Sequence, residues 1–171
     1  MQNNSQHYPF GLDQLSEVEL VVFDFDGVFT DNKVLVNQDG EESVFCSRFD
    51  GIGLAKLKQL NIPIWVLSTE TNSVVSVRCN KLEIPVIQGS KNKLNDLKNL
   101  VSELAVDLKN VLYLGNDIND LDCLFCVGFP FVVPDSHPDV LKFEFAVCKT
   151  KGGDGAVREI CDLVSAFVLG D

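Results

Sequence analysis

The sequence lacks long apolar runs and is short of positive charge. No stretch approaches the roughly 18 consecutive apolar residues of a membrane-spanning helix, so we expect no membrane partner. The first residues, Met1 to His7, have neither the basic segment nor the apolar segment of a secretory signal, which predicts a cytoplasmic location. The 25 acidic and 14 basic residues give a formal net charge of −11, which argues against nucleic acid as a partner.

A second pair of cysteines or histidines at zinc-ligand spacing is also missing. Cys123 and Cys126 are the one close pair among six cysteines, and buried free thiols are the expected state. A chain of 171 residues with 46% hydrophobic content can bury one core. We therefore predict a polar N-terminal tail over residues 1–16 and a single domain over residues 17–171.

Short apolar runs alternate with helical patterns along the whole chain. The runs predict strands at residues 18–23, 64–67, 85–87, 111–114, 130–133 and 145–147. Helical periodicity follows from residue 51, over 73–82, over 94–104, after residue 117 and over 156–168. The segment 34–45 contains an Asp-Gly turn at its centre and predicts a β-hairpin. This order predicts an α/β fold, a three-layer, doubly wound, Rossmann-like domain with a small hairpin flap.

Polar residues stand directly after several of the predicted strands. The carboxyl ends of parallel strands meet at one edge of such a sheet, so these side chains should converge. They are Asp24, Asp26, Ser68, Asn116, Asp117 and Asp120.

Each of these residues suits one part of phosphoryl transfer. One of Asp24 and Asp26 can act as the nucleophile and the other as the proton donor, with Mg²⁺ holding a phosphate against them. Asn116 and Asp117 would complete the metal coordination. Ser68 can bind a phosphoryl oxygen and Lys93 can balance its charge. Taken singly, the same residues could be a helix cap or a solvated surface charge, and only their order and spacing together favour this chemistry.

The segment Asp24-Phe25-Asp26-Gly27-Val28-Phe29-Thr30-Asp31 resembles motif one of the haloacid dehalogenase superfamily. Ser68, Lys93 and Gly115-Asn116-Asp117 are similar to its motifs two, three and four. The resemblance implies an Mg²⁺-dependent phosphatase in which Asp24 is nucleophile and metal ligand. It also implies that Asp26 is the acid/base and a ligand through its backbone carbonyl.

The absence of an inserted cap domain, the hairpin after motif one and Gly152-Gly153-Asp154-Gly155 resemble the 3-deoxy-D-manno-octulosonate 8-phosphate phosphatases. That subgroup implies a sugar acid phosphate as substrate and a homotetramer whose neighbouring subunits cover each active site. His137 lies beside a proline and is expected to be a turn or subunit-contact residue.

Two departures from that subgroup concern substrate and metal. Thr69-Glu70 replaces a Gly-Arg pair and, with Arg78, resembles the phosphatases of nonulosonate 9-phosphates (keto-deoxynonulosonate or N-acetylneuraminate). Arg78 would hold the sugar carboxylate and Glu70 the hydroxyls, so a nonulosonate 9-phosphate is the expected substrate. Asn116 replaces the usual Asp of motif four, and an uncharged ligand should weaken the binding of the metal. Asp117 and Asp120 follow shortly after it in the sequence and should lie near the same site.

Three alternatives stay open at this stage. The first is octulosonate 8-phosphate as the substrate, and the second is a promiscuous phosphatase. The third is a non-catalytic tetramerisation module like the C-terminal domain of acylneuraminate cytidylyltransferases. Retention of both motif-one acids argues against the third.

Overall fold

A parallel sheet forms the centre of the computed structural model, which describes residues 8–170. In spatial order its strands are β5 (Val86–Ile87), β4 (Ile64–Leu67), β1 (Leu20–Phe23), β6 (Val111–Gly115), β7 (Phe129–Val132) and β8 (Ala146–Val147). The chain runs outward from β1 to β4 and β5, then returns to pair β6 with the other edge of β1. This reversal of direction beside β1 is where ligands bind in such sheets, at the carboxyl ends of the strands.

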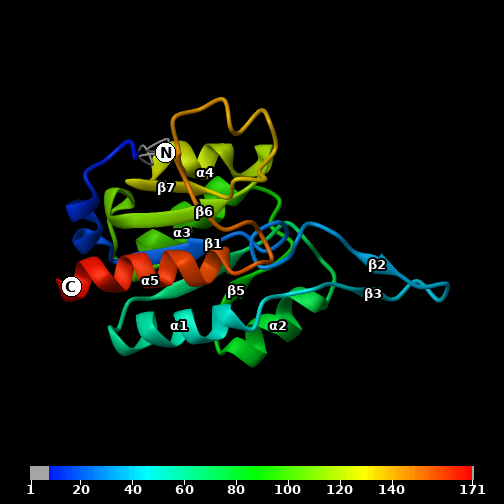
Figure 1. Ribbon diagram of the computed structural model, residues 1–171. Helices are drawn as coiled ribbons and strands as arrows, with labels where there is room; N and C mark the ends of the chain where they lie inside the picture. Colours follow the sequence, from blue (N-terminus) through cyan, green and yellow to red (C-terminus); the bar gives the residue numbers. More distant parts are fainter. Residues whose placement is uncertain (1–7, 171) are drawn as a thin grey trace, which may run out of the picture.

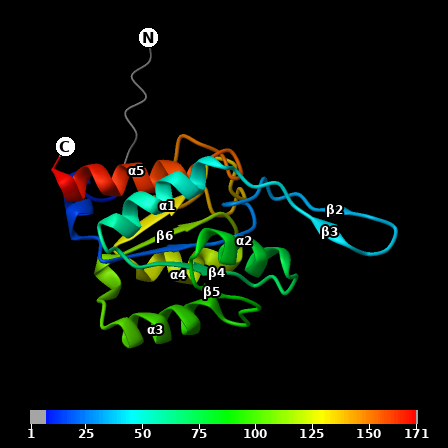
Figure 2. The same cartoon turned by 90° about the horizontal axis from the view of Figure 1, so that it is seen from below.

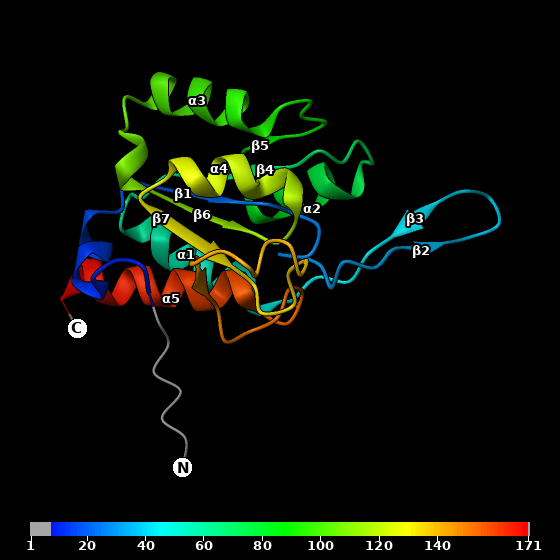
Figure 3. The same cartoon turned by 90° about the horizontal axis from the view of Figure 1, so that it is seen from above.

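Helices cover both faces of the sheet (Figures 1 and 3). One face packs against η1 (Leu12–Glu17), α1 (Phe49–Gln59), α2 (Val74–Leu82) and α5 (Ala156–Leu169). The other packs against α3 (Lys93–Leu104) and α4 (Leu121–Cys126). Successive residues of a strand point to opposite faces, so Phe23 joins the first core and Val22 the second, both with no exposed surface. The predicted three-layer α/β fold is confirmed.

The predicted hairpin projects away from the body of the domain (Figure 2). Its strands β2 (Leu35–Val36) and β3 (Glu42–Ser43) are antiparallel and shorter than expected. Gly40 closes the turn with φ of +81°, a conformation that glycine adopts without a steric penalty. The hairpin is therefore a separate two-stranded element joined to the sheet near motif one.

The N-terminal segment differs from the predicted polar tail. Phe10 and Leu12 pack against the core, and Leu15, within η1, is fully buried. Residues 1–7 of that predicted tail lie outside the described residues.

Two further short 3₁₀ helices, η2 (Leu108–Asn110) and η3 (Ile118–Asp120), flank β6. Within residues 8–170, no helix combines the length and apolar character that crossing a membrane requires.

Candidate active site

Asp24 stands at the carboxyl end of β1, at the reversal of strand order. Its backbone N–H donates to the Leu114 carbonyl at 2.9 Å, which ties the residue to β6. The carboxylate is buried, and its Oδ1 accepts the Phe25 backbone N–H at 2.7 Å. Burial raises the pKa of Asp24 to about 7, helped by nearby Asp120 and opposed by Lys93. A cation beside this carboxylate would favour its charged, nucleophilic form.

Asp26 follows in the turn that leaves β1. The Thr30 hydroxyl lies 3.4 Å from its Oδ1 and also accepts the Gly27 backbone N–H at 3.1 Å. Burial raises the pKa of Asp26, and the Glu70 carboxylate raises it further. A carboxyl group that binds its proton more tightly than usual suits a general acid.

Lys93 connects two buried carboxylates. The helix α3 begins at this residue because the Asn92 side chain caps it, accepting the Asn95 backbone N–H at 2.9 Å. The Lys93 Nζ lies 2.7 Å from Asp24 Oδ1 and 2.7 Å from Asp120 Oδ1. Burial alone would lower the pKa of Lys93, but the two carboxylates outweigh it and raise the pKa. Lys93 is therefore charged and balances Asp24.

Asp120 organises the loop after β6 rather than facing the cavity. Its Oδ1 accepts the Tyr113 hydroxyl at 2.7 Å, and its Oδ2 accepts the backbone N–H groups of Asn116 and Asp117 at 2.9 and 3.2 Å. The side chain has no exposed surface. Asp120 thus fixes the backbone of Asn116 and Asp117, two of the residues that were predicted to bind metal.

Asn116 presents a side-chain oxygen without a hydrogen-bond partner among residues 8–170. Its side-chain Oδ1 is buried and accepts no hydrogen bond from the described residues. A Cβ atom on Gly27 would lie 2.0 Å from Asn116 Nδ2, so only glycine lets the motif-one turn approach this amide. An unpaired buried oxygen is costly unless a ligand occupies it.

The residues present fit a hard divalent cation. Asp24, Asp26, Asn116 and Asp117 all line one cavity of about 400 Å³, and their donors are oxygens, as Mg²⁺ prefers. Across residues 8–170, no three His, Cys, Asp or Glu side chains gather closely enough to form a metal site by themselves. At position 116 the cavity offers an amide oxygen in place of a carboxylate.

Ser68 and Thr69 line the same cavity from the end of β4. Ser68 is buried, and its Oγ accepts the Glu70 backbone N–H at 3.1 Å, which leaves its own hydroxyl proton available to a ligand. His137 also lines this cavity, and its backbone N–H donates to the Asn116 carbonyl at 2.8 Å. The turn at His137 therefore supports motif four.

The two residues predicted to select the substrate lie apart from each other. Glu70 faces an adjoining cavity, and its Oε1 accepts the backbone N–H groups of Thr71 and Asn72 at 2.6 and 2.7 Å. Arg78 lines neither cavity; its Nη2 donates to the Ser47 carbonyl at 2.7 Å, at the stem of the hairpin. Within one subunit the structure does not bring Arg78 to the site.

Sequence reasoning missed Tyr113 and Thr30. Tyr113 lies within an apolar strand. A tyrosine hydroxyl that is buried needs a hydrogen-bond partner, so its presence in that strand could have indicated a polar residue nearby. Thr30 was noted only as part of motif one, although it bonds to both sides of the turn.

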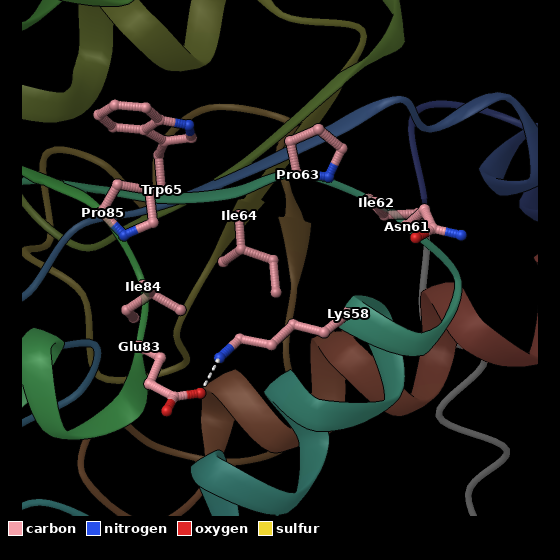
Figure 4. Close-up of a pocket in the computed structure, with 9 residues that line it drawn as sticks. All are labelled: Lys58, Asn61, Ile62, Pro63, Ile64, Trp65, Glu83, Ile84 and Pro85. Carbon is pink, nitrogen blue, oxygen red and sulfur yellow. Dashed lines mark ion pairs between the residues drawn. The ribbon is translucent and has the colours of Figure 1, made fainter.

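Another cavity, of about 450 Å³, lies at the opposite, amino ends of β4 and β5 (Figure 4). It is lined mainly by apolar side chains, and its one ion pair in the figure joins Lys58 to Glu83 at 3.6 Å. None of the predicted site residues lines it, so the chemistry is assigned to the carboxyl ends of the strands.

Comparison with known proteins identifies the family of this chain. Residues 55–160 match the family described as haloacid dehalogenase-like hydrolase. The 3-deoxy-D-manno-octulosonate 8-phosphate phosphatase of Salmonella typhimurium is 32% identical over 91% of this chain and 84% of its own.

Solved structures show the same relationship. A haloacid dehalogenase family hydrolase from Streptomyces avermitilis is 41% identical with a TM-score of 0.84, covering 96% of this chain and 90% of its own. The Moraxella catarrhalis octulosonate 8-phosphate phosphatase, solved with magnesium, phosphate and the sugar acid, is 30% identical with a TM-score of 0.86 over 91% of both chains. The predicted family resemblance and enzyme class, a phosphatase, are confirmed.

Proposed function

Because the chain belongs to the haloacid dehalogenase-like hydrolases, we propose that it is an Mg²⁺-dependent phosphatase of 3-deoxy-D-manno-octulosonate 8-phosphate. One observation carries the proposal: Asp24, Asp26 and the unpaired oxygen of Asn116 surround a single cavity at the carboxyl end of β1. The relatives that bear this name support the octulosonate substrate over the nonulosonate expected from Glu70 and Arg78.

In the first step a carboxylate oxygen of Asp24 attacks phosphorus and the bond to the ester oxygen breaks. Asp26 gives its proton to that oxygen, which leaves as the alcohol of the sugar acid. Lys93 keeps Asp24 in the charged form that attacks, since its Nζ lies 2.7 Å from the carboxylate. The product of this step is a phosphorylated Asp24.

In the second step Asp26, now a carboxylate, takes a proton from a water molecule. The water oxygen attacks phosphorus, the bond between phosphorus and Asp24 breaks, and inorganic phosphate leaves. Ser68, with its free hydroxyl proton, donates to a phosphoryl oxygen and holds the group in line with Asp24. The cycle ends with both acids in their starting states.

Asp24, Asn116, Asp117 and the backbone carbonyl of Asp26 would hold the metal. Mg²⁺ supplies positive charge that brings an anionic nucleophile and an anionic phosphate together. This charge is needed here because the whole chain is strongly acidic, with a formal net charge of −11.

A nonulosonate 9-phosphate is the second candidate substrate. It is favoured by Glu70, which faces the cavity next to Asp26 and replaces the arginine expected of the octulosonate enzymes. A carboxylate accepts hydrogen bonds from hydroxyl groups, whereas an arginine would bind a carboxylate.

We also propose a homotetramer built through the hairpins. Leu35 is 64% exposed and Phe45 is 77% exposed, which is unusual for apolar side chains on an isolated subunit. Burial of the hairpins would place Arg78, at their stem, near a subunit boundary. Light scattering after gel filtration should give the mass of four chains, and a monomer mass would contradict the assembly.

Phosphate release from a substrate panel tests the function. The panel contains octulosonate 8-phosphate, both nonulosonate 9-phosphates and p-nitrophenyl phosphate, each with Mg²⁺ and with EDTA. We expect octulosonate 8-phosphate to be the preferred substrate and Asp24→Asn to abolish turnover. Preference for a nine-carbon acid would keep the mechanism and change the substrate, while activity retained by Asp24→Asn would refute the mechanism.

A further inference from the structure

A second cavity, of about 250 Å³, adjoins the catalytic one. Asp26 and Asn32 line both cavities, so a ligand whose phosphate lies at Asp24 can extend directly into the second. Its remaining walls come from the hairpin, from the loop before α2 and from the first residue of α2. They are formed by Lys33, Val34, Glu42, Val44, Glu70 and Val74.

Asn72 orients two carboxylates on the wall of this cavity. Its side-chain Nδ2 donates to Glu42 Oε2 at 2.9 Å, and its backbone N–H donates to Glu70 Oε1 at 2.7 Å. The Gln88 side chain in turn donates to the Asn72 carbonyl at 2.7 Å, which holds the loop in place. Glu42 and Glu70 are therefore fixed acceptors, each bonded through one oxygen, rather than freely moving surface charges.

The charges around the second cavity are mostly negative. The carboxylates of Glu42 and Glu70 face it beside the acid Asp26, and the cation among its lining residues, Lys33, is paired with Asp31 at 3.1 Å. Such a wall repels a second anionic group on the substrate and accepts hydrogen bonds from hydroxyl groups. The valines at 34, 44 and 74 add apolar surface to the same wall.

We propose that this second cavity binds the hydroxyl-bearing chain next to the phosphate ester, and that Glu42 on the hairpin is a specificity-determining residue. The proposal rests on the phosphatase function above and narrows its substrate class. The accepted ester has an uncharged, hydroxylated chain near the phosphate, and the carboxylate of a sugar acid lies beyond the cavity, at the far end of the molecule. The hairpin thus helps to choose the substrate in addition to any role in assembly.

Inhibition of p-nitrophenyl phosphate hydrolysis by two probes tests the inference. Sorbitol 6-phosphate carries a hydroxylated chain and no carboxylate, and inorganic phosphate carries no chain. Loss of a hydrogen bond to a charged acceptor that is partly exposed weakens binding roughly tenfold. In Glu42→Ala we therefore expect the inhibition constant of sorbitol 6-phosphate to rise about tenfold and that of phosphate to change less than about twofold.

Asp39→Ala is the matched control, because it removes one carboxylate from the exposed hairpin turn, outside the cavity. It should leave both inhibition constants unchanged. Equal effects of Glu42→Ala on both probes, or no effect on either, would overturn the role of Glu42. An error in the proposed substrate would give a different result, because octulosonate 8-phosphate would then not be hydrolysed. The ratio of the two inhibition constants would still show whether Glu42 contributes to binding in the second cavity.

Discussion

Replacement of Lys93 by methionine should destabilise the fold and remove most of the activity. The lysine Nζ lies 2.7 Å from both Asp24 and Asp120, and its side chain is 2% exposed. Methionine keeps the apolar stem and removes the charge, so two buried carboxylates lose their shared cation. Breaking a buried ion pair costs about 3–5 kcal/mol. Asp120 keeps three other donors, so we expect the lower end, about 3 kcal/mol.

Urea unfolding at pH 7.5 in EDTA measures this loss without a contribution from bound metal. Lys91→Met is the matched control, since Lys91 is exposed and lies just before α3. It should change the free energy of unfolding by less than about 0.5 kcal/mol. With Mg²⁺ present, kcat of Lys93→Met should fall about 10²–10³-fold, as expected when a charge that supports the transition state is removed.

Two results would refute this reasoning. A Lys93→Met protein as stable as the Lys91→Met control would mean that the two carboxylates do not depend on Lys93. Unchanged turnover together with lower stability would mean that Lys93 supports the fold and has no part in holding Asp24 charged.

Three further predictions concern the metal site and a buried acid. Asn116→Asp should bind Mg²⁺ about tenfold more tightly by calorimetry because it adds a charge to the ligand set; weaker binding would contradict Asn116 as a ligand. Gly27→Ala, whose Cβ would lie 2.0 Å from Asn116 Nδ2 at a φ of +79°, should lose about 2 kcal/mol of stability, and Mg²⁺ should no longer raise its melting temperature. Burial raises the pKa of Asp50 to about 7, opposed in part by the Arg158 backbone and by Arg78, so its native state holds a proton that the unfolded state releases. The free energy of unfolding should therefore fall by up to about 4 kcal/mol as pH rises from about 4 to about 7. Urea unfolding of Asp50→Asn should lack this pH dependence. An unchanged pH dependence in the variant would show that Asp50 is ionised and paired.

Local pattern was enough to predict most of the secondary structure. The run Ile64-Trp65-Val66-Leu67 was predicted as a strand with the bounds that β4 has, and α3 begins one residue before its predicted start. Apolar periodicity and breakers such as Pro63 act within a few residues of chain, so they can be read without the fold. The N-terminal segment was mispredicted because its apolar residues at 10, 12 and 15 match neither a regular helix nor a strand and take meaning only against the core.

The sequence by itself determined which residues could carry the chemistry. Asp24, Asp26, Ser68 and Asn116 were chosen because each follows a strand, and parallel strands place their carboxyl ends together. Only the tertiary structure decided how these residues are partnered. The bridge from Lys93 to Asp24 and Asp120 joins positions far apart in the chain, as does the arrangement of Glu42 and Glu70 around Asn72. Spacing along a chain constrains neighbours strongly and distant pairs hardly at all, so charge pairing, burial and the shape of the second cavity emerge only when the layers pack.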